Sequence, residues 1–73
     1  MTNQLKQTLD TIINTINFVT NADVKSTNRK RQNVDAKYIY YKISRDNTSL
    51  STADIGMYVN RDHASVLHGL KKF

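Results

Sequence analysis

The near absence of the two residues that interrupt helices constrains this chain more than any other feature. Its 73 residues include no proline and only two glycines, Gly56 and Gly69. A chain with so few breaks favours helices joined by short turns. At this length only about 60% of the surface of the unfolded chain can be buried, which allows a single compact core. Cysteine is also absent, so packed apolar side chains must stabilise the fold, and we predict a small all-α domain.

An apolar residue recurs at steps of three and four along the first twenty residues, which is the spacing of one helix face. The spacing predicts a helix from about Asn3 to Thr20. Its apolar face consists of Leu5, Leu9, Ile12, Ile13, Ile16 and Val19. This helix either covers the core of the domain or pairs with a second copy of the chain, and we favour core cover. We treat residues 1–22 as this amphipathic segment and residues 23–73 as a second unit.

A second helix is predicted after the polar, basic segment at residues 21–31. Asn33 is placed to cap it, Asp35 would lie in its first turn, and it extends to about Arg45. Its apolar face consists of Ala36, Ile39, Tyr40 and Ile43, and its other side carries Lys37, Tyr41, Lys42 and Arg45. The tyrosines are either stacking platforms for single strands or core residues, and their helical spacing favours the core.

Two short helices are predicted to follow the turn at RDNTS. Ser51 and Asp54 form a start similar to a capping box for a helix that extends through Tyr58. Asp62 can cap the last helix, whose buried stripe is predicted to consist of His63, Val66, Leu67, Leu70 and Phe73. The outward side of that helix would carry Arg61, Asp62, Ala64, Ser65, His68 and Lys72. Two short helices joined by a tight turn make a helix-turn-helix.

Positive charge is concentrated in the middle of the chain. The formal net charge is +5. Residues 25–45 contain one acidic side chain, Asp35, against Lys25, Arg29, Lys30, Arg31, Lys37, Lys42 and Arg45. A local basic patch of this kind favours a polyanionic partner, although a solvated basic surface has the same composition.

Patterns typical of enzymes and metal sites are missing. Asp62, His63 and Ser65 have the residue types of a hydrolytic triad, but neighbours one and two positions apart on a helix point in different directions. His63 and His68 are five residues apart, which is not a chelating spacing on a helix, and His68 is better explained as a structural residue. No phosphate-cradling G-x-x-x-x-G-K-[ST] loop is present. We expect no enzymatic activity, no metal and no cofactor.

The segment IGMYVNRDHASVLHGLKKF resembles the C-terminal duplex-DNA-binding domain of the bacterial replication initiator DnaA family. The string RDHASVLH carries the likeness, because the signature of that family is a glycine-containing turn followed by RDHTTVLHA. Upstream, DVKSTNRKRQ is similar to the short helix and basic loop of the family, VDAKYIYYKISRDNTSLS to its long helix, and TADIG to its first helix-turn-helix element. The resemblance covers residues 23–73 and implies an all-α helix-turn-helix domain similar to the Trp repressor class.

The resemblance also implies which residues contact DNA. In the family the RDH segment enters the major groove, and an arginine of the basic loop reaches the minor groove. Carried over by position, the implied base contacts are Arg61, Asp62, His63, Ala64 and Arg29. The implied backbone contacts are Lys37, Arg45, Ser65, Arg31 and Lys30. Asp62 is either a base contact or only a helix cap, and the resemblance favours the base contact.

We call the implied base-contacting residues Arg61, Asp62, His63 and Ala64 the reading edge. Two departures from the signature of the family fall in it or directly before it. Ala64 replaces the first threonine, and Asn60 stands in place of glycine in a turn that is one residue shorter. Both changes affect which duplex sequence the domain would select. The family's ATPase module is also missing, so this chain alone would bind such a site without opening it.

The residues and the resemblance together predict sequence-specific binding of double-stranded DNA at a site like the short duplex box of the family. The chain would act as a domain of an initiator or as a small stand-alone regulator. The alternative is a helix-turn-helix module that binds a protein partner, and a homodimer through the N-terminal helix is a further option. Apolar runs are only a few residues long and no secretory signal is visible, so we expect no membrane segment and a cytoplasmic, nucleoid-associated location.

Overall fold

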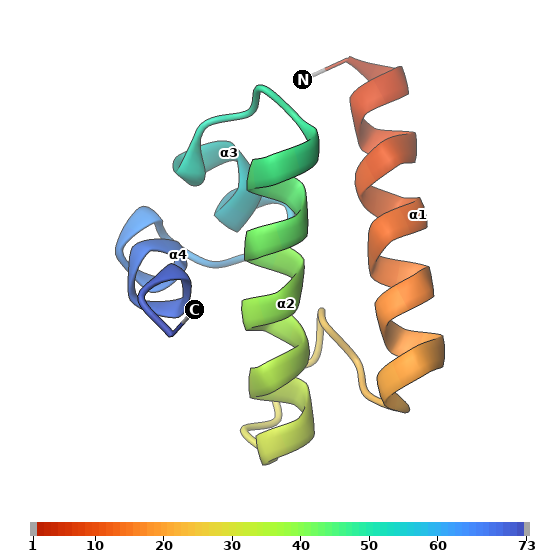
Figure 1. Ribbon diagram of the computed structural model, residues 1–73, viewed down its shortest axis with the longest axis vertical. Coiled ribbons are helices and arrows are strands. Elements are labelled where there is room, and N and C mark those ends of the chain that lie inside the picture. Colours follow the sequence, from red (N-terminus) through yellow and green to blue (C-terminus); the bar gives the residue numbers. More distant parts are fainter. Residues whose placement is uncertain (1, 73) are drawn as a thin grey trace.

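The regular secondary structure of the chain is entirely helical in the computed structural model, which describes residues 2–72. The helices are α1 (Asn3–Thr20), α2 (Arg31–Asn47), α3 (Thr52–Met57) and α4 (His63–Leu70). α2 lies in the middle of the molecule, with α1 packed along one side and α3 and α4 packed on the other (Figure 1). The predicted all-α fold with a helix-turn-helix is therefore confirmed.

α1 begins and ends where its sequence pattern predicts. The Thr2 side chain caps its first turn by accepting a hydrogen bond from the Leu5 amide, and Asn21 ends the helix in a left-handed conformation with φ of 52°. Leu9, Ile13 and Ile16 are buried against α2. The prediction was wrong for Val19, which is 74% exposed. Three-residue steps fall short of a full turn, so Val19 has rotated away from the buried line.

α2 begins two residues before the predicted cap. Lys30 occupies the N-cap position without a side-chain hydrogen bond, and the helix continues to Asn47. The prediction that Asn33 caps this helix was wrong, because its Oδ1 atom accepts from the Asp23 amide at 2.9 Å and holds the preceding loop. Asp35, which was expected in the first turn, instead pairs with Arg31 across one turn at 3.7 Å.

α2 is buried on two sides, whereas the sequence predicted one apolar face. Ala36 and Tyr40 are fully buried, as expected. The prediction that Lys37 and Tyr41 face outward was wrong, since only 6% and 2% of their surfaces are exposed. α4 packs on this second side against Tyr41, and Lys37 is tied to the basic loop by its hydrogen bond to the Ser26 carbonyl oxygen. The interpretation of the tyrosines as core residues is therefore confirmed for Tyr40 and Tyr41.

The turn between α3 and α4 is tight because Gly56 has no side chain. The Arg61 amide donates to the Gly56 carbonyl oxygen at 2.8 Å. A Cβ atom at Gly56 would lie 2.8 Å from both the Arg61 carbonyl oxygen and Val66 Cγ2. Asn60 completes the turn in a left-handed conformation with φ of 60°. α3 itself begins at the predicted cap, where Ser51 Oγ accepts from the Asp54 amide at 3.2 Å.

α4 turns a different side toward the core than the sequence predicted. Val66 is fully buried, and Leu70 packs against the core. The prediction of a stripe through His63 and Leu67 was wrong, because His63 is exposed and Leu67 is 38% exposed. Gly69 is buried instead, and a Cβ atom there would lie 2.6 Å and 2.7 Å from the two tyrosine rings of α2 that face it. Gly69 therefore lets α4 approach α2 on this side. Phe73, the last residue of the predicted stripe, lies outside the described residues.

One hydrophobic core joins all four helices. Leu9 of α1 belongs to the same buried cluster as Val24 of the loop, Ile55 of α3 and Val66 of α4. Core cover by α1 therefore agrees with the observed packing. None of the helices within residues 2–72 has the length and apolar content that spanning a membrane requires.

Candidate nucleic-acid interface

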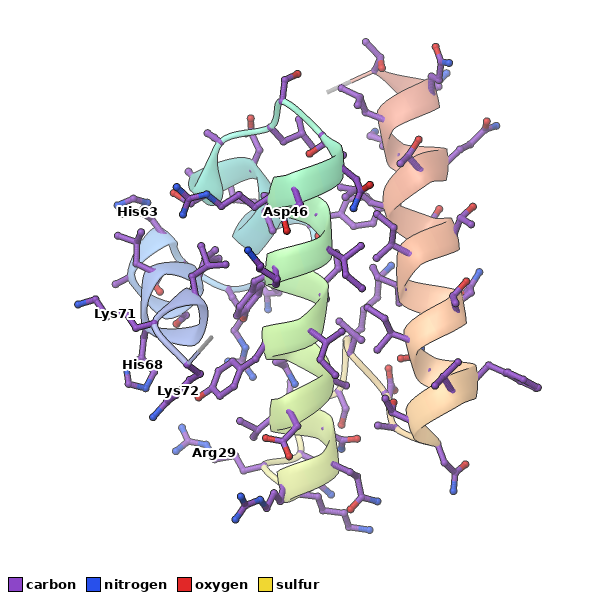
Figure 2. All side chains as sticks on the ribbon, viewed as in Figure 1. Arg29, Asp46, His63, His68, Lys71 and Lys72 are labelled. Atoms are coloured by element: carbon purple, nitrogen blue, oxygen red, sulfur yellow. The ribbon has the colours of Figure 1, made fainter. Side chains whose placement is uncertain are left out.

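The RDH segment lies at the start of α4. Arg61 is half-buried in the turn, Asp62 caps the helix, and His63 is its first residue. Ala64 is exposed one position further along. Figure 2 shows the labelled α4 side chains, including His63, on the outer side of the molecule, and Arg29 of the preceding basic loop projects toward the same side. Two of the base contacts implied by the resemblance, Arg29 and His63, thus lie on a common side.

Asp62 has a structural role in this helix. Its Oδ1 atom accepts a hydrogen bond from the Ser65 amide at 2.8 Å, which is the geometry of an N-cap. This hydrogen bond is the main reason that the pKa of Asp62 lies below its usual range. Its carboxylate is therefore ionised at neutral pH and can accept further hydrogen bonds. The cap is observed, and the base contact stays a prediction.

A hollow of about 310 Å³ separates the basic loop from α4. It brings together three cationic side chains from different parts of the chain: Arg29 from the loop, Lys37 from α2 and Arg61 from the turn. The remaining lining residues are Asn28, Val34, Tyr38, Tyr41, Ser65 and His68, and none of them is acidic. A concave, basic surface with hydroxyl and amide donors suits an anionic group such as a phosphate.

Lys37 is the buried cation among the residues that line this hollow. Its Nζ atom donates to the Ser26 carbonyl oxygen at 2.6 Å, which ties the basic loop to α2. Burial lowers the pKa of Lys37, and the positive charge of Arg61 lowers it further, while Asp23 opposes both effects. An incoming anion would relieve the repulsion between the two cations.

The basic loop is held in shape by its own polar side chains. Ser26 Oγ accepts from the Asn28 amide at 3.0 Å, and Asn28 Oδ1 accepts from the Lys30 amide at 2.9 Å. These short-range hydrogen bonds replace the missing secondary structure between α1 and α2. The loop therefore presents Arg29 from a defined backbone, although the Arg29 side chain itself is exposed.

Three of the predicted backbone contacts lie outside this hollow. Arg31 pairs with Asp35 and lines a separate hollow near Lys72. Lys30 is an exposed N-cap residue, and Arg45 is exposed in the last turn of α2. A second hollow at the start of α4 shares Arg61 and Ser65 with the first one. The concave surface therefore centres on Arg61 and Ser65.

Sequence reasoning missed several residues of this surface, among them Asn28, Tyr38 and Thr52. Asn28 and Tyr38 line the hollow, and the Tyr38 ring lies edge-on to the His68 imidazole with centroids 6.3 Å apart. Thr52 of α3 lies 2.7 Å from His63 through its Oγ1 atom. His68 itself was recognisable, because Ser65 and His68 are three positions apart, which is the spacing of one helix face. Tyr38 and Thr52 come from other helices, so no local pattern marks them.

Within residues 2–72, histidine and acidic side chains do not gather into a group of three that would hold a metal ion. His63 and His68 belong to the polar surface of α4, and their described partners are Thr52 and the Tyr38 ring.

Comparison with known proteins identifies the family. Residues 7–73 match the family described as the bacterial dnaA protein helix-turn-helix. The chain is 42% identical over 74 residues to the chromosomal replication initiator protein DnaA of Lachnoclostridium phytofermentans and 35% identical over 68 residues to that of Bacteroides fragilis. These matches cover 96% and 88% of this chain but only 16% and 14% of the two relatives. No solved structure matches the chain. The extent of the family match and these identities show that the chain belongs to the bacterial DnaA helix-turn-helix family.

Proposed function

We propose that this chain binds double-stranded DNA sequence-specifically, at a site like the duplex box that the DnaA family recognises. The observation that carries the proposal is the meeting of Arg29, Lys37 and Arg61 around one concave surface beside the exposed start of α4. Membership of the DnaA helix-turn-helix family supports the same partner. Clustered cations give affinity for phosphates, and exposed polar side chains on a helix give selectivity among bases.

The proposed docking places the first turn of α4 in the major groove. Arg61, Asp62, His63 and Ala64 would lie against base edges there, and Arg29 would reach the adjacent minor groove. Arginine pairs well with guanine, and a carboxylate accepts from the cytosine amino group. Asp62 can do this with an oxygen that its cap leaves available, because a carboxylate has about four lone-pair sites.

The remaining basic residues would contact phosphates. Ser65 and Lys37 would do so from inside the hollow, and Lys30, Arg31 and Arg45 from the exposed surface. Lys37 is buried, so its contact requires a phosphate that enters the hollow, or one bridged by water.

The role of the whole protein is a separate part of the proposal. The chain spans about a sixth of the length of the first relative, which is named a chromosomal replication initiator. We assign it to replication initiation, as a domain of an initiator or as a stand-alone regulator that occupies initiator sites in the nucleoid. Residues 1–22 would be a leading helix, and residues 23–73 would carry the DNA-binding surface.

A second candidate function is binding to a protein partner. Phe18 and Val19 on α1 are 89% and 74% exposed, which leaves two large apolar side chains in water. Such a pair suits a protein surface or a second copy of α1 better than it suits DNA. DNA binding is favoured because these two residues make a small patch, whereas the basic surface draws on three parts of the fold.

Selection of binding sites from random duplex DNA, followed by a salt titration on the selected site, tests the proposal. We expect one enriched sequence. Affinity should fall on the order of a hundredfold between about 50 and about 200 mM salt if about four phosphates are neutralised. No enriched sequence together with salt-independent binding would favour the protein-partner alternative.

A further inference from the structure

A hydrogen bond joins the two helices of the helix-turn-helix at the reading edge. Thr52 is the first residue of α3 and His63 is the first residue of α4. Thr52 Oγ1 lies 2.7 Å from His63 Nδ1, although the residues are 11 positions apart in sequence. His63 is exposed, so its other ring nitrogen, Nε2, is free to meet a ligand.

The hydroxyl of Thr52 is not needed for the fold of α3. Ser51 is the N-cap of this helix, and its Oγ atom accepts from the Asp54 amide. Thr52 occupies the next position with its side chain half-buried, and within residues 2–72 its hydroxyl is hydrogen-bonded to His63 alone. A valine would fill the same space without this hydrogen bond.

The direction of the bond to Thr52 decides what His63 can offer to DNA, because a threonine hydroxyl can either donate to Nδ1 or accept from Nδ1–H. A neutral imidazole has one nitrogen that donates and one that accepts. When the Thr52 hydroxyl donates to Nδ1, the ring hydrogen lies on Nε2. The imidazolium form also carries hydrogen on Nε2, because both of its nitrogens are donors. Both of these states present a donor to the DNA, whereas a neutral ring that donates its Nδ1 hydrogen to the Thr52 hydroxyl would present an acceptor.

We propose that Thr52 is a positioning residue that orients the His63 ring and makes Nε2–H a donor to an acceptor atom in the major groove. The acceptors there are N7 and O6 of guanine, N7 of adenine and O4 of thymine. The inference rests on the proposed DNA-binding function and assigns specificity to a residue that does not itself contact DNA.

The test compares Thr52→Val, which removes the hydroxyl and keeps the shape, with Thr52→Ser, which keeps the hydroxyl. Thr11→Val is the matched control, because the Thr11 hydroxyl bonds the Gln7 carbonyl oxygen of its own exposed helix face. Binding would be measured on the selected duplex, on every single-base variant of it and on a scrambled duplex. NMR of the imidazole nitrogens would report the hydrogen position in the free proteins.

In the wild type, the neutral His63 ring should carry its hydrogen on Nε2 and accept a hydrogen bond at Nδ1. Thr52→Val should lose this preference. A neutral hydrogen bond contributes about 0.5–1.5 kcal/mol, so affinity of Thr52→Val for the selected duplex should fall about 2- to 12-fold. The loss should concern one base pair, the same one for which His63→Ala loses selectivity, and the double variant should lose no more than His63→Ala. Thr52→Ser and Thr11→Val should resemble the wild type.

Three results would overturn the inference. A wild type that selects no duplex contradicts the proposed function and the inference together. A selective wild type whose base preferences are unchanged in Thr52→Val leaves the function intact and removes Thr52 from it. Equal losses on selected and scrambled duplexes, with a lower melting temperature, would show that Thr52 has only a structural role.

Discussion

At the scale of single residues, two glycines determine how α4 packs and which of its sides is exposed. Gly56 lets the turn close against Val66, and Gly69 lets α4 approach the tyrosines of α2. Asn60 tolerates the left-handed conformation between them, which asparagine adopts more readily than most residues. The position of the reading edge therefore depends on residues that would not touch DNA.

Gly56→Ala should destabilise the domain. The new Cβ atom would lie 2.8 Å from the Arg61 carbonyl oxygen, and a backbone atom cannot give way as a flexible side chain can. Overpacking of this kind costs about 1–3 kcal/mol, measurable by urea denaturation. Asn60→Gly in the same turn is the control and should change stability by less than about 0.5 kcal/mol, because glycine also adopts positive φ. Equal stabilities of Gly56→Ala and the wild type would contradict this packing.

Ala64→Thr should sharpen base selectivity without changing the fold. Ala64 is exposed on the first turn of α4, so a threonine there meets no core residue. Its methyl and hydroxyl groups would add contacts that alanine lacks, and a good base contact contributes about 1–3 kcal/mol of discrimination. Binding to single-base variants of the selected duplex measures the effect. Identical base preferences in the two proteins would show that residue 64 does not face the bases.

At the scale of elements, the helices were predictable, whereas their burial was predictable only in part. The apolar spacing of residues 3–20 gave α1 its observed bounds, and the Ser51 cap placed the start of α3. Lys37 and Tyr41 were expected outside because periodicity within one helix reveals one apolar face only. Their burial follows from tertiary contacts, since Tyr41 lies against Gly69 of α4 and Lys37 is bonded to Ser26 of the basic loop. Asn33 was misassigned because its partner, the Asp23 amide, lies ten residues away.

The residues of the candidate site were likewise predictable only in part. Arg61, Asp62 and His63 were found from the motif, and Arg29 was found from the basic loop that the resemblance identified. The hollow that joins Arg29 to Arg61 depends on the tertiary packing of loop, α2 and α4. Residues that complete a surface from another helix, such as Thr52, have no signal in a single sequence.

Two variants in α2 separate two roles of its basic residues, which are to hold the basic loop against α2 and to contact DNA phosphates. Lys37→Ala and Arg45→Ala should both weaken binding to selected and scrambled duplexes, and each should lower the salt slope by about one unit. Lys37→Ala should also reduce thermal stability, because it removes the hydrogen bond to the Ser26 carbonyl oxygen. Arg45 is exposed, so its loss should leave stability unchanged. A change of base preference with an intact salt slope would contradict the phosphate assignment for either residue.

The contact between α1 and the end of α3 makes a part of the stability of the domain depend on alkaline pH. The Tyr58 hydroxyl donates to the Asp10 carboxylate, and this hydrogen bond raises the pKa of Tyr58 to about 12. The unfolded chain would lose the same proton near pH 10, so the stabilisation is complete below that pH and is lost as pH rises toward about 12. Urea denaturation should show the free-energy difference between wild type and Tyr58→Phe shrinking across this window. A constant difference would mean that the hydrogen bond does not hold the proton.

At the scale of the whole molecule, α2 connects a helix that carries little charge to a basic surface. α1 covers the core from one side of α2 (Figure 1). The loop, α2 and the turn before α4 bring their cations together around one hollow. The net charge of +5 is therefore not spread evenly. This arrangement leaves one face suited to a polyanion and a separate pair of apolar side chains, Phe18 and Val19, on α1.

The most direct test of the proposed interface is an NMR titration of the labelled chain with its selected duplex. We expect chemical-shift changes at residues 28–31 and 61–68, with Phe18 and Val19 unaffected, because the proposed DNA face lies across α2 from α1. The changes should weaken as salt is raised, since phosphate contacts release counterions. Shifts centred on Phe18 and Val19, or no shifts at residues 61–68, would contradict the assignment of α4 and the basic loop as the DNA-binding surface.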